Sequence, residues 1–124
     1  MTLLDTSVII DFLLGDQKVV ALVKEILAKE SAKTTTITEY ELLRHKAKIR
    51  KQAAELFLSG ADVYSFDRPA AREAADLYVE LQNNGKIINE NDLLIASIAL
   101  AHDEVLLTRD RKLASIGKEN IKSI

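Results

Sequence analysis

Short apolar runs alternate with longer amphipathic stretches along the whole sequence, and this alternation constrains the fold more than any other feature. We expect strands at residues 2–5, 33–38, 61–66, 104–108 and 120–124. Apolar residues at helical spacing predict helices at 7–15, 16–30, 69–85, 89–103 and 109–117, and one long or two short helices over 39–60. Such alternation predicts an α/β fold, in which helices cover both faces of a parallel sheet.

Length and composition narrow the possible classes of protein. The 124 residues contain no repeat or linker, so we expect a single domain over residues 1–124. Cys is absent, which excludes disulfides, thiolate catalysis and Cys-ligated zinc and is compatible with a reducing cytoplasm. A net charge of -2 gives no global attraction to nucleic acid, so any such binding must depend on a local patch.

The apolar segments are too short or too interrupted for a membrane protein. Asp5 and Asp11 break the first apolar run, and no basic segment precedes it, so it does not resemble a signal peptide. The longest apolar stretch, LLIASIALA at 93–101, is far shorter than the roughly 20 residues that span a bilayer. We therefore expect a soluble, cytoplasmic protein that does not associate with membranes.

Four acidic residues are expected at one edge of the predicted sheet, because the carboxyl ends of parallel strands meet there. Asp5 follows the first strand, and Asp110 follows the strand at 104–108. Glu41 lies near the start of the helix after 33–38, and Asp92 lies at the start of the apolar helix LLIASIALA. Segments far apart in sequence thus supply carboxylates to one place.

Each acid alone also has a structural explanation. The three aspartates could cap helices, and Glu41 could be a solvated helix residue. Capping does not explain the clustering, because neighbouring like charges raise one another's pKa unless a cation neutralises them. Oxygen-only ligands favour Mg²⁺ or Mn²⁺, and such a site can activate water and stabilise the leaving oxygen of a phosphodiester.

Four segments in this order, DTSVIID, TITEYELL, NDLLIASIALAH and LLTRDRKL, resemble the PIN domain, and most closely the VapC-type toxins of prokaryotic toxin–antitoxin pairs. The resemblance covers essentially the whole chain. It implies a three-layer PIN-like fold with a central parallel sheet flanked by helices. It also implies a Mg²⁺- or Mn²⁺-dependent endoribonuclease that cuts RNA, forms a homodimer and is held inactive by a cognate antitoxin protein.

The same resemblance assigns the residues of the site. It implies that four acids bind the metal and carry catalysis, and that two hydroxyl residues support them: Asp5, Glu41, Asp92 and Asp110, with Thr6 and Thr108. The sequence departs from the family at His45, where many relatives have Gly after the Glu-Leu-Leu run. This departure bears on local helix geometry more than on catalysis.

Two other classes of function stay open at this point. A non-catalytic PIN-like module would bind RNA or a partner protein, although retention of all four acids argues against it. A phospho-acceptor receiver domain also places acids at strand ends. That scheme requires adjacent acids after the first strand, however, and only Asp5 stands there.

Some charged residues near the four acids have roles that the sequence leaves open. Glu39 and Glu41 are two positions apart, so on a helix they point roughly 200° from each other. We predict that Glu41 faces the site and Glu39 faces solvent, whereas a contribution from Glu90 stays open. Basic residues in RHKAKIRK (44–51) could follow an RNA backbone or form a solvated helix face. The cations that flank Asp110 could meet a phosphate or form surface salt bridges: Arg109, Arg111 and Lys112.

Overall fold

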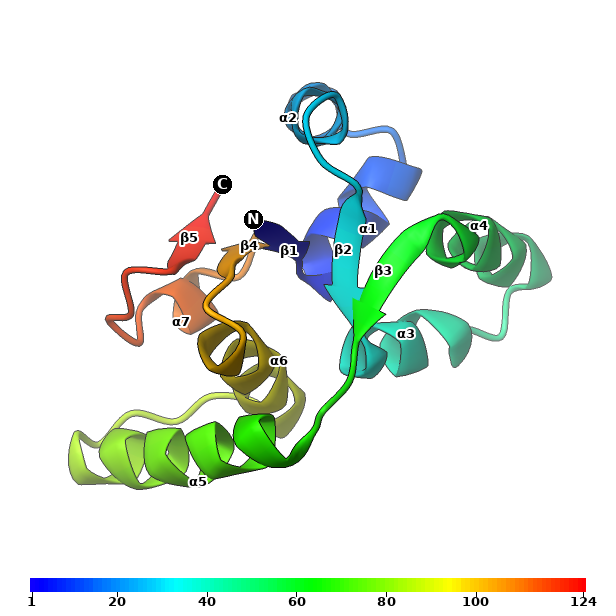
Figure 1. Cartoon of the computed structure of the whole chain (residues 1–124). Helices are drawn as coiled ribbons and strands as arrows, with labels where there is room; N and C mark the ends of the chain where they lie inside the picture. The colour runs from blue at the N-terminus through cyan, green and yellow to red at the C-terminus, as the bar shows by residue number, and fades with distance from the viewer.

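Five short parallel strands run through the middle of the molecule, with helices on either side (Figure 1). The structure is a computed structural model that describes residues 1–124. The strands are β1 (Thr2–Leu4), β2 (Ala32–Thr35), β3 (Ala61–Tyr64), β4 (Val105–Thr108) and β5 (Ile121–Ser123). The predicted α/β class and the parallel direction of the strands are thus confirmed.

The backbone ladder of the sheet is interrupted at one place. Strands β1, β4 and β5 form one parallel set in the order β1-β4-β5, and β2 and β3 form a parallel pair. β1 lies beside β2, where the Thr34 hydroxyl donates a hydrogen bond of 2.7 Å to the carbonyl oxygen of Leu4. A side chain therefore links the two sets at a position where the sequence predicts a continuous sheet.

Seven helices connect the strands. They are α1 (Thr6–Leu13), α2 (Gln17–Leu27), α3 (Thr36–Leu43), α4 (Lys48–Ser59), α5 (Arg68–Asn83), α6 (Glu90–Ala101) and α7 (Arg111–Ala114). Side chains of Asp16, Asp67 and Asn89 accept hydrogen bonds from the first turns of α2, α5 and α6, which fixes where these helices begin. The 39–60 region forms two helices, one of the two arrangements that the sequence allows.

The predicted strand at 33–38 is too long, because α3 begins at Thr36. The Thr35 hydroxyl accepts a hydrogen bond of 3.1 Å from the backbone N–H of Thr38 and so caps the helix. As a result Glu41 lies in the second turn of α3, not near its start, and Glu39 lies within the helix as well.

The two faces of the sheet bury separate apolar clusters. Neighbouring side chains of a strand point to opposite faces. Leu3 and Leu106 accordingly pack with residues of α5, α6 and α7, and Leu4 and Leu107 pack with residues of α1 to α4. This gives the three layers that the PIN resemblance implies. None of the helices combines the length and the apolar character needed to cross a membrane.

Candidate active site

Asp5 occupies the start of α1 without acting as a helix cap. Asp5 occupies the N-cap position, but its side chain makes no capping hydrogen bond. Instead one oxygen, Oδ2, accepts hydrogen bonds from the hydroxyls of Thr108 at 2.7 Å and Ser7 at 2.8 Å. The other oxygen, Oδ1, is buried and has no partner. Burial raises the pKa of Asp5 despite these two hydrogen bonds, so the ionised carboxylate is short of stabilising contacts.

Glu41 reaches toward Asp5 from α3 and is held by neutral donors. The Thr6 hydroxyl donates to Oε1 at 2.6 Å, and the Asn91 side chain donates to Oε2 at 3.3 Å. The Arg44 guanidinium lies 3.8 Å from Oε2 but is itself largely exposed. Glu39 is half-buried, whereas the helix geometry predicts that it faces solvent. Its side chain forms no hydrogen bond or ion pair.

Asp92 is the most perturbed acid of the group. It lies in the first turn of α6, whose cap is Asn89, so Asp92 is not the cap itself. Burial raises its pKa to about 7, and the charges of Asp5, Asp110 and Glu41 act in the same direction, as does a hydrogen bond with Asp110. The structure thus brings all four predicted acids into electrostatic contact at the carboxyl edge of the sheet.

Asp110 differs from the other three because it does cap a helix. Its Oδ1 accepts a hydrogen bond of 2.9 Å from the backbone N–H of Lys112 in α7. Its own N–H donates to the Thr108 hydroxyl at 3.0 Å, the same hydroxyl that holds Asp5. The structural explanation therefore applies to Asp110, which also contributes negative charge beside Asp92.

The sequence analysis missed Ser7 and Asn91 as members of this network. The Ser7 hydroxyl donates to Asp5 and accepts a hydrogen bond of 2.9 Å from the N–H of Arg109, so it ties α1 to the end of β4. Asn91 holds Glu41 from α6. The available signals were weak: Ser7 stands two residues after Asp5, and Asn91 immediately precedes Asp92.

Some of the charged side chains near the four acids form ion pairs, and others are exposed to solvent. Arg109 pairs with Asp11 at 3.1 Å and with Asp16 at 3.7 Å, so the salt-bridge interpretation holds for this residue. Arg111 and Lys112 are exposed. Glu90 is also exposed, and its side chain forms no hydrogen bond. His102 lies 3.1 Å from Asp67, a pairing that the sequence did not predict.

The oxygen atoms of the four acids are the type of ligand that a hard divalent cation prefers, although the four side chains are not arranged as a closed binding site. All candidate ligands are carboxylate oxygens, and the unpaired Oδ1 of Asp5 is available. No three acidic or histidine side chains are arranged closely enough to form a ready-made ion cage.

Comparisons with known proteins agree with the architecture. Residues 2–119 match the PIN domain family, and the chain belongs to this family. Ribonuclease VapC2 from Rickettsia felis is 35% identical over 75 residues, which are 60% of this chain and 56% of that protein. The aligned region therefore spans little more than half of that relative.

Solved structures agree over nearly the whole chain. One is VapBC2 from Rickettsia felis bound to a DNA fragment from their promoter, with a TM-score of 0.83 and 25% identity over 98% of this chain and 97% of that one. Another is DNA-bound VapBC from Salmonella typhimurium, which has a TM-score of 0.83 and 23% identity over 98% and 96% of the two chains and so concerns the fold alone. The PIN resemblance is confirmed, and the receiver-domain alternative is wrong.

Proposed function

We propose that this protein is a divalent-metal-dependent endoribonuclease and the toxin of a toxin–antitoxin pair. The observation that carries the proposal is the convergence of four acids from four separate segments. Burial, together with the charges of the other three acids, raises the pKa of Asp92 to about 7. A fold without a use for this site would gain by replacing some of these charges, because each opposes the ionisation of the others. The similarity to Ribonuclease VapC2 supports RNA as the substrate.

The proposed ion is Mg²⁺ or Mn²⁺, held by Asp5, Glu41 and Asp92, with Asp110 completing the site directly or through water. Such an ion supplies an activated water and stabilises the leaving oxygen of a phosphodiester. Thr108 and Ser7 hold Oδ2 of Asp5, and Oδ1, which has no hydrogen-bond partner, is the proposed ligand atom.

Other groups of the chain orient the remaining acids. Thr6 and Asn91 each hold one oxygen of Glu41, so they fix the plane of that carboxylate. Asp92, with its pKa of about 7, is about half protonated at neutral pH when no cation is bound. A bound cation would displace that proton, because a metal favours the ionised ligand.

The proposed partners are an antitoxin and a second copy of the chain. Solved VapBC complexes support an antitoxin partner. Because the acids carry negative charge without a buried cation, we expect the antitoxin to insert an Arg or Lys among them, with Arg favoured for bidentate pairing. Undiminished neutralisation after every basic residue of the docking segment is replaced would contradict this part of the proposal.

The activity itself is tested by incubating the purified protein with mixed RNA in Mn²⁺ and in chelator. We expect cleavage only with the ion, and a loss of cleavage by orders of magnitude in Asp5→Asn. Thermal unfolding in chelator provides the control for folding, since Asp5→Asn removes charge repulsion and should be as stable as the wild type or more so. Cleavage by a folded Asp5→Asn protein at the wild-type rate would exclude the metal site.

A non-catalytic PIN module predicts a different result in the same experiment. Such a protein would bind RNA or a partner protein equally well in the ion and in chelator, and it would cut nothing under either condition. Metal-dependent cleavage therefore separates the two functions.

A further inference from the structure

An open cleft lies beside Glu41, one of the four acids, and follows the loop between α3 and α4. It encloses about 590 Å³, and its acidic end is formed by Thr6 and Glu41. Its other wall carries Arg44, His45 and Lys46. Two cations, Arg44 and Lys46, and the imidazole of His45 thus line the same cleft as Glu41.

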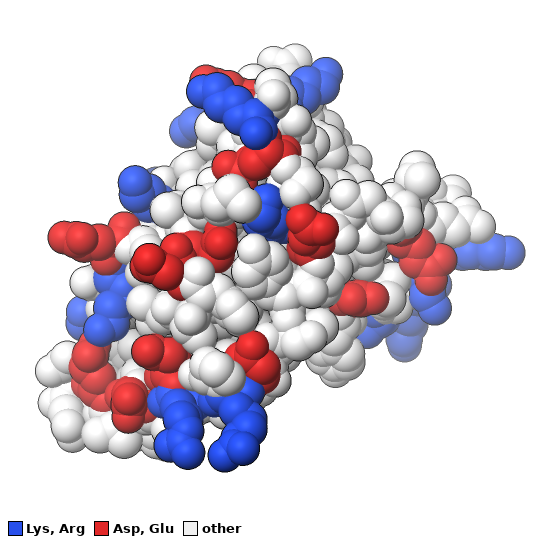
Figure 2. Space-filling model, in the orientation of Figure 1, with Lys and Arg blue, Asp and Glu red and all other residues white.

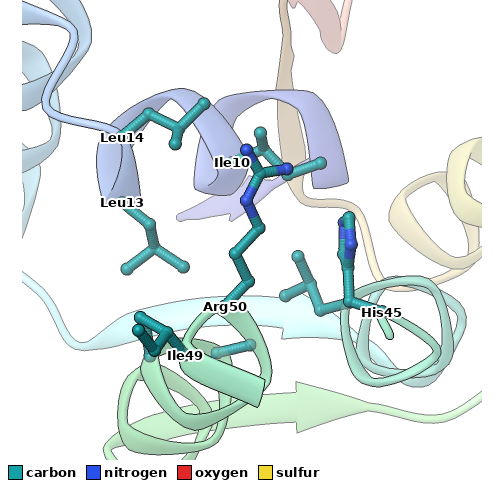
Figure 3. A pocket seen from close by; sticks show the side chains of 9 residues that line it. Ile10, Leu13, Leu14, His45, Ile49 and Arg50 are labelled. Atoms are coloured by element: carbon teal, nitrogen blue, oxygen red, sulfur yellow. The ribbon is translucent and has the colours of Figure 1, made fainter. Parts of the chain in front are cut away.

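An apolar pocket adjoins this cleft and shares one wall with it. The pocket encloses about 280 Å³ between α1 and α4, and Ile10 and His45 line both hollows. Figure 3 shows His45 and Arg50 extending toward α1 from the opposite side of this pocket. His45 therefore stands at the junction, where its ring can contact a ligand in the cleft.

The cations on the two sides of the acids differ in how far the chain already neutralises them. Arg109, beyond Asp110, is bound by two aspartates at 3.1 and 3.7 Å. Lys46 is exposed and forms no ion pair, and His45 makes no hydrogen bond. Arg44 pairs with Glu41 at 3.8 Å and lies over the Tyr40 ring at 5.2 Å.

Attraction of a polyanion to this protein must be local. The net charge is -2, and Figure 2 shows acidic and basic side chains interleaved over the face in view, without a broad basic patch. A strand whose reacting phosphate lies at the acids needs cations beside that point to offset repulsion by the carboxylates. The cleft wall supplies them at the required position.

We infer that the RNA strand leaves the acidic site along the α3–α4 loop, where Arg44, His45 and Lys46 hold the phosphates that neighbour the one being cut. The inference rests on the proposed ribonuclease function and adds the path of the substrate. His45 and Lys46 are positioning residues in this scheme. Arg44 has a second contact, because it also offsets the charge of Glu41.

Binding of a fluorescent single-stranded RNA, followed by anisotropy in Mg²⁺ at several salt concentrations, tests this path. Asp5→Asn serves as the parent so that the RNA stays intact. Adding Lys46→Glu should raise Kd about tenfold or more and reduce the slope of log K against log salt by about 0.7 for the lost phosphate contact. Adding His45→Ala should raise Kd by a smaller factor.

The matched control is Lys24→Glu in the same parent. Lys24 is exposed on α2 and lines neither hollow, so this change alters net charge equally without touching the cleft. We expect less than about a twofold change in its Kd, because distant exposed charges are screened. Equal weakening by Lys46→Glu and Lys24→Glu, no weakening by either, or no RNA binding by the parent would overturn the inference.

Failure of this path can be told apart from failure of the proposed function. A wild-type protein that cuts no RNA in Mn²⁺ refutes the function. A wild-type protein that cuts RNA, together with a Lys46→Glu variant whose Kd and KM match those of Lys24→Glu, refutes only the path.

Discussion

Acids gather at both ends of the strands, but only at the amino end does a buried cation of the chain pair with one of them. There, Glu30 accepts a hydrogen bond of 2.8 Å from the N–H of Thr2 and faces the buried Lys33 ammonium at 3.8 Å. Asp62 accepts a hydrogen bond of 2.8 Å from Ser31. At the carboxyl end, the acids have hydroxyl and amide donors and no buried cation.

Glu104, at the amino end, is an exception, because one of its carboxylate oxygens is buried without a hydrogen bond. That oxygen lies 3.8 Å from the amino group of Met1. Its other oxygen lies 3.4 Å from the Tyr64 hydroxyl. Burial and the charge of Glu104 raise the pKa of Tyr64, so that hydroxyl remains a donor across the physiological range.

The difference between the two ends indicates which acids are structural. A buried charge that the chain itself pairs has its electrostatic partner within the fold, whereas carboxylates at close range without a buried cation oppose one another's ionisation. The amino end therefore needs no ligand for its balance. The carboxyl end, where Asp5 and Asp92 have raised pKa values, is the end at which an external cation would relieve the repulsion.

The largest effect is expected within the carboxyl end, between two glutamates of α3. Glu41→Gln should lower metal-dependent RNA cleavage by orders of magnitude, because Glu41 lies among the acids and is held by Thr6 and Asn91. Glu39→Gln should keep most of the activity, since Glu39 has no polar contact with the site. Rates measured for both variants at saturating Mn²⁺ check this. The reverse pattern would transfer the ligand role to Glu39, and full activity in both would remove α3 from the site.

A smaller effect, on stability alone, is expected at the amino end. Lys33→Met should lower the free energy of unfolding by about 1–2 kcal/mol, less than the roughly 3–5 kcal/mol for breaking a fully buried pair. The Glu30 side chain retains 21% exposure, which limits the cost. Denaturant unfolding measures the loss, with Lys24→Met on the exposed face of α2 as the control.

Cleavage by Lys33→Met under native conditions should equal that of the wild type. A loss of cleavage in the folded variant would show that the two ends are coupled, and it would remove the distinction between a balanced and an unbalanced end.

The smallest effect is expected from Asp92→Asn, which should stabilise the metal-free protein more at high pH than at low pH. Its pKa in the folded protein is raised from 3.8 to about 7, so the folded state binds a proton more tightly than the unfolded state between these values. Stability therefore falls as pH rises through this interval. In chelator, Asp92→Asn should raise Tm by a few degrees at about pH 8 and by little at about pH 4. Equal gains at both pH values would contradict the assignment of the repulsion to Asp92.

Most of the architecture follows from local sequence signals. The alternation of strands and helices predicts the parallel α/β class, and side chains such as Asp16 and Asp67 cap helices as their residue types favour. The end of β2 was misplaced, because TTTIT is β-branched throughout and only the hydrogen bond from Thr38 to Thr35 ends the strand. The break between β1 and β2 depends on tertiary packing and leaves no local signal.

The sequence predicts which acids meet at the site, but not the side chains that hold them. The rule that parallel strands share a carboxyl edge places Asp5 and Asp110 together, because β1 and β4 are neighbours in register. The partners of these acids could not be predicted, since the contacts of Ser7 with Arg109 and of Asn91 with Glu41 join residues that are far apart in sequence. For the same reason the sequence could not show that Arg109 is already paired.

Mn²⁺ binding to the protein without its partner, followed by electron paramagnetic resonance, tests the central claim most directly. The claim is that the carboxyl end of the strands, and not the amino end, carries charge that a divalent cation must balance. We predict that the wild type and Lys33→Met bind Mn²⁺ with equal affinity and that the folded double variant Asp5→Asn/Asp92→Asn does not bind it. Equal Mn²⁺ binding by the double variant and the wild type would contradict the account.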